Sequence, residues 1–598
     1  MAIASMVKVN LFGTSDQQET VLDSLQDLGC VHLVDLSERV EPGPPTPDIS
    51  SETLQAVKYL RACPTRRRPV HDAHGFQFEQ VVHEALRIEL RQQQLQAERD
   101  ELLPAIRDLT PWGDFRLPLG GELGDLRLWF YIVPHYRMRS LLQREAVWHV
   151  ASRDSRFTYL VVVSPTEPEE MPVPRVRLDD RPLSALRKRL ETVELELEDL
   201  HWQRVSLTRW NALLTRTIDF AHDLAVRQRA ARQAWSDPSM FVLQGWAPLS
   251  EADHVRDFTR EHALGLTIEQ PSDTEFPPTL LRNSGLMAGG QGAVTFYTTP
   301  AYRAWDPTAV VFISFSVFFA MIMADAGYAL VLGGLLLILW RKIGRAPGGP
   351  GLRQLSLAVV VASLAYGVAV GSYFGLPPGK GSVLEKLHLI DAADTTLMMQ
   401  ISIGLGAAHL ALANLALAWN RRRSPQMVGS LGWVAMVLGG LALGFGKSGV
   451  EPQAELVRFG TTGLIAGVIA VVLFSSERPL LSLRLSNHLW RLLDGLQALT
   501  GISRAFGDVL SYLRLFALGL ASSQLAATFN ELVYKASCCV GVGSLLAIVA
   551  VVFGHGLNFT LAIMSGVVHG LRLNCIEFFG WGLPGEGYAF QPFCKRET

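Results

Sequence analysis

A single arginine, Arg514, lies in an apolar stretch of mostly small residues that runs from 509 to 529. A helix over this stretch is long enough to lie within a bilayer, where a buried charge costs about 3 kcal/mol or more and is kept only beside a partner or a wet cavity. The alternative is an arginine near a helix end that extends to the headgroups. The apolar residues continue to Phe529, which favours the buried interpretation.

Several residues within two helical turns of Arg514 on its own face are small, although Leu510 and Leu518 also lie on that face. Gly507, Ser511, Ala517 and Ala521 share its helical face, so a second helix can approach closely there. An arginine on a smooth surface is suited to a partner that moves past it.

Other ionisable residues lie at or near membrane depth in the same half of the chain. His569 and Arg572 are three residues apart on one helical face, and Glu577 follows them. Taken singly, each can be a structural hydrogen-bonding group, which is the favoured interpretation for the two upstream histidines. As a set they predict a polar path for ions. The candidates are Arg514, Ser511, Arg572, His569, Glu577, Asp325, Asp508, His409 and His555.

Several other kinds of site are not indicated. Gly375–Lys380 and Gly446–Ser448 lack Walker A spacing, so we expect no ATP site of the P-loop type. The six cysteines have neither metal-type spacing nor a disulfide pattern, and adjacent Cys538 and Cys539 are interpreted as apolar filling. A net charge of -2 gives no reason to expect nucleic acid. We therefore expect no cofactor and no metal.

The composition changes near residue 303. The chain has 598 residues, of which 18% are charged, which is too polar for a wholly membrane-embedded protein and too apolar for a wholly soluble one. The N-terminus shows no basic segment followed by an apolar one, so it is not a secretory signal. We predict a cytosolic domain over 1–303 and a transmembrane domain over 304–598.

The predicted soluble half consists of β-α-β lobes joined by helical arms. Residues 7–12, 31–36, 126–133 and 240–246 have the pattern of strands, with a further strand near Leu266. An Arg-rich helix is expected after 133 and another helix from Glu251.

Heptad repeats in two further segments predict an antiparallel coiled coil. One arm has core positions Val81, Ile88, Leu95 and Leu102; the other has Leu183, Leu190 and Leu197 with Leu186, Val193, Leu200, Leu207 and Leu214, interrupted at Arg204 and Asn211. The alternative is long amphipathic helices within one globular domain.

The membrane half is predicted to contain eight spans. Residues 309–340 would form one helix of about 48 Å, against a hydrocarbon core of about 30 Å, so a break at 325–328 would give two short spans. The others are expected at 354–373, 397–419, 427–446, 458–475, 499–530 and 541–577. Basic flanks at Arg341, Arg421–Arg423, Arg478, Arg484 and Arg491 fall on every second loop, which places both termini in the cytosol.

The segment 507–521, Gly-Asp-Val-Leu-Ser-Tyr-Leu-Arg-Leu-Phe-Ala-Leu-Gly-Leu-Ala, resembles the signature helix of the membrane stator of rotary V-type and A-type ATPases, called subunit a or subunit I. The resemblance continues in order along both halves. The other segments that carry it are Gly245–Pro248, Asp306–Thr308, Asp325–Tyr328, Gly371–Gly375, Gly554–Asn558, His569–Leu573, Glu577–Phe579 and Phe590–Phe593.

The resemblance implies a non-catalytic subunit of an ion-translocating rotary ATPase in a bacterial or archaeal cell membrane. Its implied partners are a proteolipid ring, the peripheral stalk subunits, the soluble ATPase sector through the stalks, and the lipid bilayer. Arg514 would be the charge that faces the ring, and the ion would be H⁺ or Na⁺. Two departures put the lining of the half-channels in doubt: this chain has Gly501 and Arg504 where relatives can carry an acidic residue, and Ala562 lies near a glutamate position of eukaryotic relatives.

Two other classes of membrane protein would explain part of the sequence. A secondary ion transporter with a cytosolic regulatory domain would show two related halves, and no such repeat is evident. A membrane-tethered scaffold would account for the coiled-coil arms, but not for an arginine among small residues.

The loop charges give a first prediction. The 374–396 loop should lie outside and both termini inside. Single cysteines introduced into this loop should react with an impermeant maleimide added to sealed right-side-out vesicles, and cysteines near either terminus should not. Protection of the 374–396 loop would rule out the eight-span arrangement.

Overall fold

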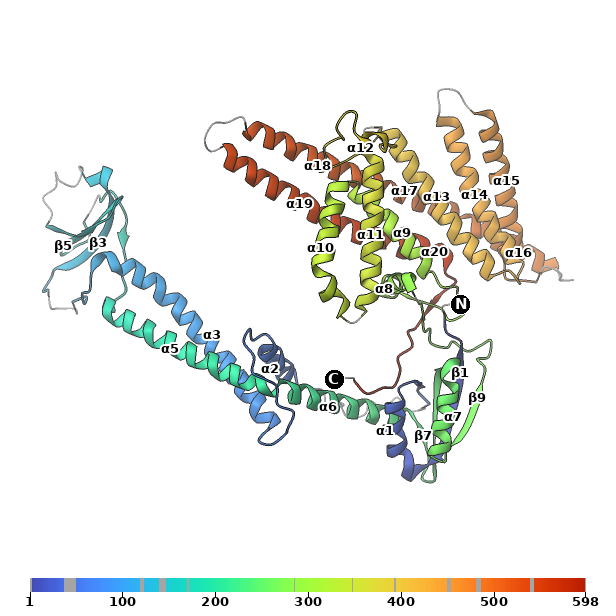
Figure 1. Ribbon diagram of the computed structural model, residues 1–598, viewed down its shortest axis with the longest axis horizontal. Helices are drawn as coiled ribbons and strands as arrows, with labels where there is room; N and C mark the ends of the chain where they lie inside the picture. Colours follow the sequence, from blue (N-terminus) through green and yellow to red (C-terminus); the bar gives the residue numbers. More distant parts are fainter. Residues whose placement is uncertain are drawn as a thin grey trace. The chain divides into compact units, whose positions relative to one another are not determined.

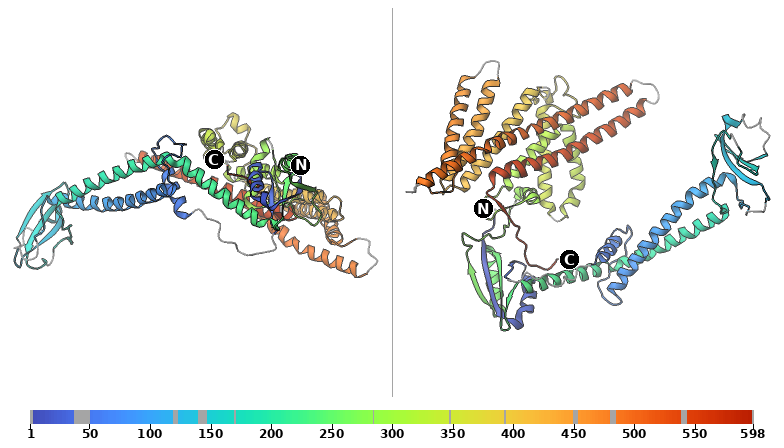
Figure 2. Two further views of the ribbon diagram at one scale, coloured as in Figure 1. Left: turned by 90° about the horizontal axis from the view of Figure 1, so that it is seen from below. Right: turned by 180° about the vertical axis from the view of Figure 1, so that it is seen from behind.

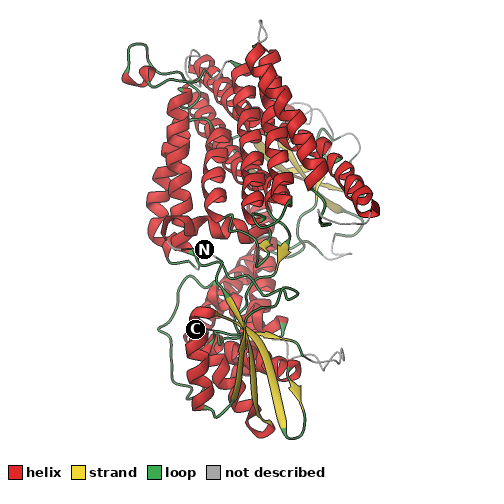
Figure 3. Ribbon diagram, turned by 90° about the vertical axis from the view of Figure 1, so that its right-hand side faces the viewer, coloured by secondary structure: helices red, strands yellow, loops and turns green. Residues whose placement is uncertain are grey.

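The computed structural model describes residues 3–36, 50–118, 123–138, 147–168, 171–283, 285–346, 348–391, 394–448, 453–479, 485–537 and 543–596. Its contacts divide the chain into two compact units. The first contains Met1–Gln17, Cys30–Leu36 and Trp235–Phe593; the second contains Gln18–Gly29, Ser37–Ala234 and Cys594–Thr598. These two units differ from the two domains expected on either side of residue 303. The expected boundary separates cytosolic from transmembrane residues, and it remains a prediction. Figures 1 and 2 show the elements, and Figure 3 shows the strands in yellow.

The sheet in the first unit is antiparallel and combines two β-α-β connections. Its strands are β1 (Met6–Thr14), β2 (His32–Val34), β7 (Trp235–Ser236), β8 (Met240–Pro248) and β9 (Gly265–Glu269), in the order β2-β8-β1-β9, with β7 beside β8. The connections β1–α1–β2 and β8–α7–β9 run through α1 (Gln18–Leu28) and α7 (Ala252–Glu261). Each pair of parallel strands is separated by a strand of the other pair, which is a split β-α-β arrangement. The strands predicted at 7–12, 31–36, 240–246 and near Leu266 are confirmed.

A second antiparallel sheet belongs to the second unit. It contains β3 (Arg127–Pro134), β4 (Trp148–Arg153), β5 (Phe157–Ser164) and β6 (Arg175–Val176), in the order β4-β5-β3-β6. Tyr131, Val133, Leu160 and Val162 form its core. The strand predicted at 126–133 is confirmed. The Arg-rich helix expected after it falls largely on 139–146, outside the described residues.

The coiled coil predicted from the heptads is present and antiparallel. It pairs α3 (Phe78–Leu109) with α5 (Leu183–Leu207). The four predicted core positions of the first arm are all buried, and Leu95, Leu102 and Leu109 pack with Leu183, Leu186 and Val193. These six residues form one apolar seam between the two helices.

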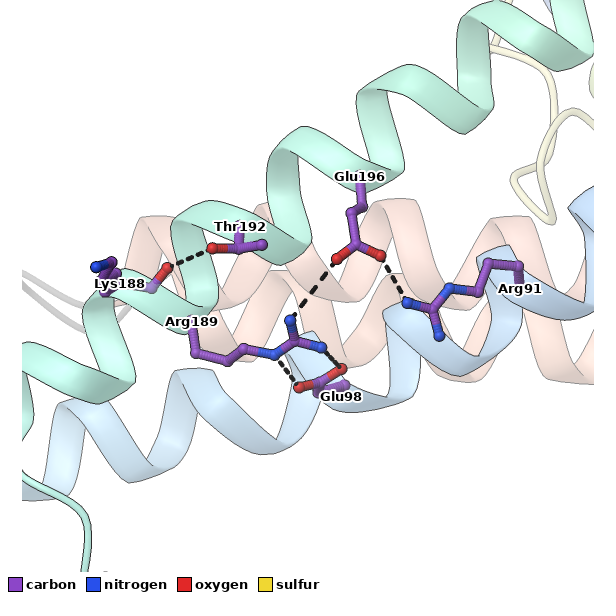
Figure 4. Close-up of polar contacts among 6 residues, drawn as sticks. All are labelled: Arg91, Glu98, Lys188, Arg189, Thr192 and Glu196. Atoms are coloured by element: carbon purple, nitrogen blue, oxygen red, sulfur yellow. Dashed lines mark hydrogen bonds and ion pairs between the residues drawn. The ribbon is translucent and has the colours of Figure 1, made fainter.

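Ion pairs across the coiled coil have the same register (Figure 4). Arg189 Nε lies 2.6 Å from Glu98 Oε1, and Arg91 Nη2 lies 2.6 Å from Glu196 Oε2. The hydrogen bonds from Arg189 lower the pKa of the Glu98 carboxyl group. A depressed carboxyl pKa adds stability at neutral pH that is lost as the pH falls through that pKa. Because both side chains are partly exposed to solvent, the pair adds little stability and chiefly specifies register.

The two interruptions of the second heptad series have structural causes. The Arg204 guanidinium lies 3.9 Å from the centroid of the Tyr59 ring on α2 (Ser51–Arg61), and Arg204 Nη2 donates to the Tyr59 carbonyl. Asn211 opens α6 (Asn211–Gln233), because the 3₁₀ turn η4 (Thr208–Trp210) ends α5. The arm predicted to run through 214 is therefore two helices rather than one.

The C-terminal half is helical. Its elements are α8 (Ala288–Tyr297), α9 (Thr308–Met323), α10 (Ala326–Gly344), α11 (Gly349–Val370), α12 (Val383–Lys386), α13 (Thr395–Asn420), α14 (Gln426–Ser448), α15 (Ala454–Phe474), α16 (Leu485–Leu499), α17 (Gly501–Ser511), α18 (Leu513–Ser537), α19 (Gly543–Arg572), the π-helix η7 (Leu573–Phe578) and α20 (Phe579–Gly582). Two short strands, β10 (Thr299–Pro300) and β11 (Glu586–Gly587), pair with each other.

Seven helical stretches in the described part of the chain are long and apolar enough to cross a membrane, with Ser486–Ser537 and Gly543–Gly582 each counted once. The helix α9 is apolar but shorter. Together they account for the eight expected spans. The side of the membrane on which each loop lies remains a prediction.

The break predicted in the 309–340 run is confirmed. The helix α9 ends at Met323, Ala324 adopts a left-handed conformation with φ of 47°, and Asp325 caps α10 by accepting from Tyr328 N at 2.9 Å. The 372–375 turn completes this arrangement, since Ser372 Oγ, Phe374 N and Gly375 N also donate to the carboxylate. The break is thus built around one buried aspartate.

The long loop expected after α15 is not a simple basic loop. It contains α16, whose Arg491 is only 7% exposed. Arg491 Nη2 donates to the Leu473 carbonyl at 2.6 Å and Nη1 donates to the Arg478 carbonyl at 2.5 Å. Because the last carbonyls of a helix lack intrahelical partners, Arg491 acts as a cap for α15. Arg484 lies outside the described residues.

The helices α14 and α15 pack backbone to backbone through glycines. Gly432 and Gly439 are one heptad apart on α14, and Gly460 and Gly467 are one heptad apart on α15. A Cβ atom at Gly460 would lie 2.6 Å from Leu443 N and 2.8 Å from Gly439 O. Small residues with this spacing allow the close helix contact that is common in membranes.

Replacing Gly460 with leucine should therefore separate the α14–α15 hairpin. Overpacking of this kind costs about 1 to 3 kcal/mol, so the thermal midpoint of the purified chain should fall by several degrees. Gly440→Leu is the matched control, because nothing lies within 4 Å of a Cβ atom at Gly440. Equal midpoints for the two variants would contradict this packing.

Candidate ion-translocation site

Arg514 lies in the first turn of α18, directly after a break in the helix at Tyr512. The predicted helix over 499–530 is therefore two helices, α17 and α18, that meet at this residue. Arg514 is partly buried, and its Nη2 donates to Ser511 Oγ at 3.1 Å. Its Nη1 is buried and has no hydrogen-bond partner within the described residues. Part of the hydrogen-bonding capacity of the guanidinium is thus unused within the described residues.

Glu577 is linked to Arg514 through Ser511. Ser511 Oγ donates to Glu577 Oε1 at 2.7 Å, while it accepts from the arginine. The glutamate is 3% exposed, and its Oε2 has no partner in the part of the chain that the structure describes. The serine hydroxyl therefore positions two opposite charges without neutralising Arg514 through a direct ion pair.

A π-helix sets the position of Glu577. In η7, Asn574 Nδ2 donates to the Gly570 carbonyl at 2.9 Å, and Ser314 Oγ on α9 donates to Asn574 Oδ1 at 2.5 Å. A π turn rotates the residues after it relative to a regular helix, and such turns are frequent at functional sites. Leu573, Asn574, Cys575, Glu577 and Phe578 are all buried as a result.

His569 and Arg572 differ in their exposure, although the sequence places them on one helical face. His569 is partly buried, and its Nδ1 has no partner within the described residues. Arg572 is exposed. Both lie near enough to Arg514 for their charges to interact, so this end of α19 adds a second cation beside the first.

His409 joins the site from α13. Its Nδ1 lies 2.7 Å from the hydroxyl of Tyr512, which is fully buried at the α17–α18 break. The imidazole stacks on Phe578 with ring centroids 4.3 Å apart. Sequence reasoning missed Tyr512 because an aromatic residue in an apolar run carries no sign of a helix break.

Asp508 forms a separate group one turn before the break. Its Oδ2 accepts from Trp581 Nε1 at 2.7 Å and lies 3.5 Å from Arg504 Nε. The Arg504 guanidinium also lies 5.4 Å from the centroid of the Trp581 ring. Arg504, which stands where relatives can carry an acidic residue, thus has Asp508 as its acidic partner.

His555 belongs to a third group, between α10, α18 and α19. Its Nδ1 lies 2.8 Å from Tyr328 Oη, and its Nε2 lies 3.1 Å from Asn530 Oδ1. Asn558 Nδ2 donates to the same tyrosine oxygen at 3.0 Å, and Ser522 Oγ lies 3.3 Å from Asn558 Oδ1. These side chains form a continuous polar chain beside α18.

Asp325 does not join any of these groups. Its four hydrogen bonds cap α10 and hold the 372–375 turn. They support a structural role for this carboxylate, and a role in an ion path stays a prediction.

The small residues on the Arg514 face lie on an open surface. Nothing lies within 4 Å of a Cβ atom placed at Gly507, and Ala517 and Ala521 are exposed. The opposite face of α18 is packed, as Gly519 and Ala526 show. The arginine therefore borders a smooth face that this chain leaves uncovered.

Among the described residues, no group of three or more histidine, cysteine or acidic side chains is arranged to hold a metal ion. The long apolar helices together with this polar set define an integral membrane protein with ionisable groups gathered on two long helices.

The comparisons with known proteins find similarity to the same family that the sequence resembles. Residues 504–595 match the V-type ATPase 116kDa subunit family. The chain is 28% identical over 422 residues to the V-type ATP synthase subunit I of Chlamydia trachomatis, an alignment that covers 60% of this chain and 62% of the relative. It is 23% identical over 627 residues to the V-type ATP synthase subunit I of Borreliella burgdorferi, with 100% of both chains covered.

An archaeal relative is also similar. The A-type ATP synthase subunit I of Pyrococcus horikoshii is 29% identical over 378 residues, covering 60% of this chain and 54% of the relative. The chain spans about three fifths of the length of the chlamydial relatives that it matches. A crystal structure of the cytoplasmic N-terminal domain of subunit I, a homolog of subunit a of V-ATPase, matches with a TM-score of 0.25 and 17% identity over 44% of this chain and 99% of that chain.

The hydroxyl group that links Arg514 and Glu577 gives a prediction. Ser511→Ala removes the hydrogen bonds of both side chains and leaves a buried carboxylate with no partner, which costs about 1 to 3 kcal/mol or more. The thermal midpoint of the purified chain should fall, and Ser511→Thr should restore most of it. Ser523→Ala on α18 is the control. Equal midpoints for Ser511→Ala and Ser523→Ala would show that the linkage is dispensable.

Proposed function

We propose that this chain is the stator subunit of a rotary V/A-type ATPase, and that Arg514 is the fixed charge past which the carboxylates of a proteolipid ring move. The observation that carries the proposal is an arginine whose Nη1 has no partner among the described residues, on a helix whose small residues Ala517 and Ala521 are exposed. The names of the matched relatives, subunit I of V-type and A-type ATP synthases, support it.

The attraction between Arg514 and a ring carboxylate would couple rotation of the ring to the transfer of an ion. Two unit charges about 4 Å apart at an effective dielectric constant near 20 attract by about 4 kcal/mol. This attraction favours the ionised form of a ring carboxylate, which must release its ion before it passes Arg514. The ring can then advance only when an ion is lost on one side and another is loaded on the other.

Arginine suits this position better than lysine. Its guanidinium stays charged and presents several N–H donors in a plane, so it can bind both oxygens of a carboxylate. Ser511 accepts a hydrogen bond from Nη2, while Nη1 has no partner among the described residues. Ser511 and Glu577 thereby orient the Arg514 guanidinium without accepting hydrogen bonds from all of its N–H groups.

Two polar groups on either side of Arg514 are the candidates for offset half-channels. Asp508 and His409 with Tyr512 lie toward the start of α18. The chain of Asn530, His555, Tyr328 and Asn558 lies toward its far end. Arg514 and Asn530 are separated by about 24 Å along a helix. This separation suits two paths that enter from opposite sides and meet near the arginine.

The coiled coil of α3 and α5 is the proposed contact with the stationary stalks. Its ion pairs and apolar seam make a stiff arm, and several large side chains along it remain exposed, including Leu90, Leu195 and Trp202. We propose no catalysis for this part of the chain.

The decisive substitution is Arg514→Ala. The variant should assemble, because the open face does not hold a fixed partner within this chain, yet it should lose ATP-driven ion uptake in reconstituted vesicles. Arg514→Lys should fail or nearly so, since lysine lacks the planar donors. Arg458→Ala on α15 removes the same charge from an exposed site and is the control.

Arg572→Ala tests the second cation. It is expected to reduce both transport and assembly. Uptake is normalised to assembled complex, and near-normal coupled uptake by Arg514→Ala would overturn the proposal. Uptake that persists without an ATPase sector would instead favour a secondary transporter.

The stalk proposal has its own test. A fragment of residues 1–303 should be soluble, largely helical by circular dichroism, and should retain peripheral stalk subunits in a pull-down. Leu195→Glu, which places a charge on an exposed apolar position of the arm, should weaken that retention, whereas Glu194→Gln should not. A fragment that binds ATP tightly, or binds no stalk protein, would contradict the stalk role.

A further inference from the structure

A second apolar site lies apart from the Arg514 group, between α8, α9, α10, α11 and the last turns of α19. It is a groove of about 930 Å³ lined chiefly by aliphatic and aromatic side chains, among them Phe315, Phe319, Leu336, Leu355 and Ile563. A volume near the upper end of the range of about 300 to 1,000 Å³ suits a large ligand.

The helix α8 forms one wall of the groove because its glycines allow close contact. A Cβ atom at Gly289 would lie 2.5 Å from Gly351 O, and one at Gly290 would lie 2.5 Å from Thr308 O. The next glycine, Gly292, lines the groove, and a Cβ atom there would have nothing within 4 Å. Phe296 and Tyr297 at the end of α8 are exposed, as aromatic residues at a membrane surface commonly are.

Four cations lie at the turn between α10 and α11, next to this groove. They are Arg341, Lys342, Arg345 and Arg353. The turn itself borders the groove, because Ile343, Gly348 and Leu352 are among its lining residues. The sequence contains no aspartate or glutamate from 326 to 384. The Arg353 guanidinium lies over the Trp340 ring, 4.9 Å from its centroid, so this cation is held at the turn without a carboxylate partner on α10 or α11.

We propose that this groove binds an anionic phospholipid of the bilayer, with acyl chains along the apolar walls and the phosphate at the basic turn between α10 and α11. An apolar groove at membrane depth favours hydrocarbon over water. Basic pockets between transmembrane helices are suited to anionic lipid headgroups. The positive charge of the turn and the apolar walls of the groove therefore both favour an anionic phospholipid. This proposal does not depend on the proposed rotary function.

Photolabelling of the full-length chain tests the proposal. The chain is placed in phosphatidylcholine vesicles that contain a small fraction of phosphatidylglycerol with a photoreactive acyl chain, and labelled peptides are identified by mass spectrometry. Label should appear in α8, α10 and α11, and unlabelled phosphatidylglycerol should displace it whereas phosphatidylcholine should not. The same labels are expected in fragments of the native membrane.

Two pairs of variants separate the contributions of shape and charge. Gly292→Leu should fill the groove and abolish labelling, whereas Gly334→Leu, at an open position of α10 outside the groove, should not. Lys342→Gln and Arg353→Gln should each weaken phosphatidylglycerol binding about fivefold, which corresponds to about 1 kcal/mol per charge. Arg422→Gln is the control, because Arg422 also lies over a tryptophan, Trp419, at a helix end away from the groove.

Three results would overturn the proposal. They are equal displacement by the two lipids, equal labelling of the Gly292→Leu and Gly334→Leu variants, and a groove that stays unlabelled in native membranes. The last result would mean that a helix of another protein covers the groove.

Discussion

The membrane domain depends on one constraint, which is a charged arginine inside an apolar helix. The chain satisfies only part of the hydrogen-bonding capacity of this side chain. A charge at membrane depth is costly unless it has a partner or water. Ser511 supplies one acceptor, and Glu577 supplies opposite charge through that serine. Arg514 Nη1 remains without a partner among the described residues. A site of this kind holds the charge in the helix with part of its hydrogen-bonding capacity unused, which is what the proposed stator role requires.

The surrounding structure makes this arrangement rigid. The buried Tyr512 marks the break between α17 and α18 and contacts His409, whose ring stacks on Phe578 of the π-helix. The π-helix in turn places Glu577 inside the protein. On the far side, the capped break at Asp325 holds α10 beside α19, where Tyr328 joins the polar chain to His555. The helices are therefore fixed on one side of Arg514, while the small-residue face on the other side stays open.

Much of this fold follows from simple sequence patterns. The heptads predicted the antiparallel coiled coil because burial of one apolar seam determines the register, as the Glu98–Arg189 pair confirms. The length of the 309–340 run predicted the break at Asp325, since one helix of that length exceeds the bilayer. The strand patterns predicted β-α-β units, but not that two of them combine into one split sheet, because pairing partners far apart in the chain leave no local pattern.

The site was predictable only in part. The cost of a buried charge identified Arg514, and helical spacing identified the small residues beside it. The break at Tyr512, the π turn before Glu577 and the cap formed by Arg491 arise from tertiary packing that no periodicity records. For the same reason the sequence grouped Asp325 with the ionisable candidates, although its carboxylate is occupied by four hydrogen bonds.

The most direct test of the central claim is a disulfide cross-link between this chain and the ring. A single cysteine replaces Ala517 on the open face, in a chain whose own cysteines are replaced by alanine, and a second lies beside the ion-binding carboxylate of the proteolipid subunit. Oxidation should join the two subunits and stop ATP-driven ion uptake, and reduction should restore it. A cysteine at Ala526, which is 1% exposed on the packed face, should not cross-link. Failure at Ala517 in the assembled complex, or equal cross-linking at Ala526, would contradict the account.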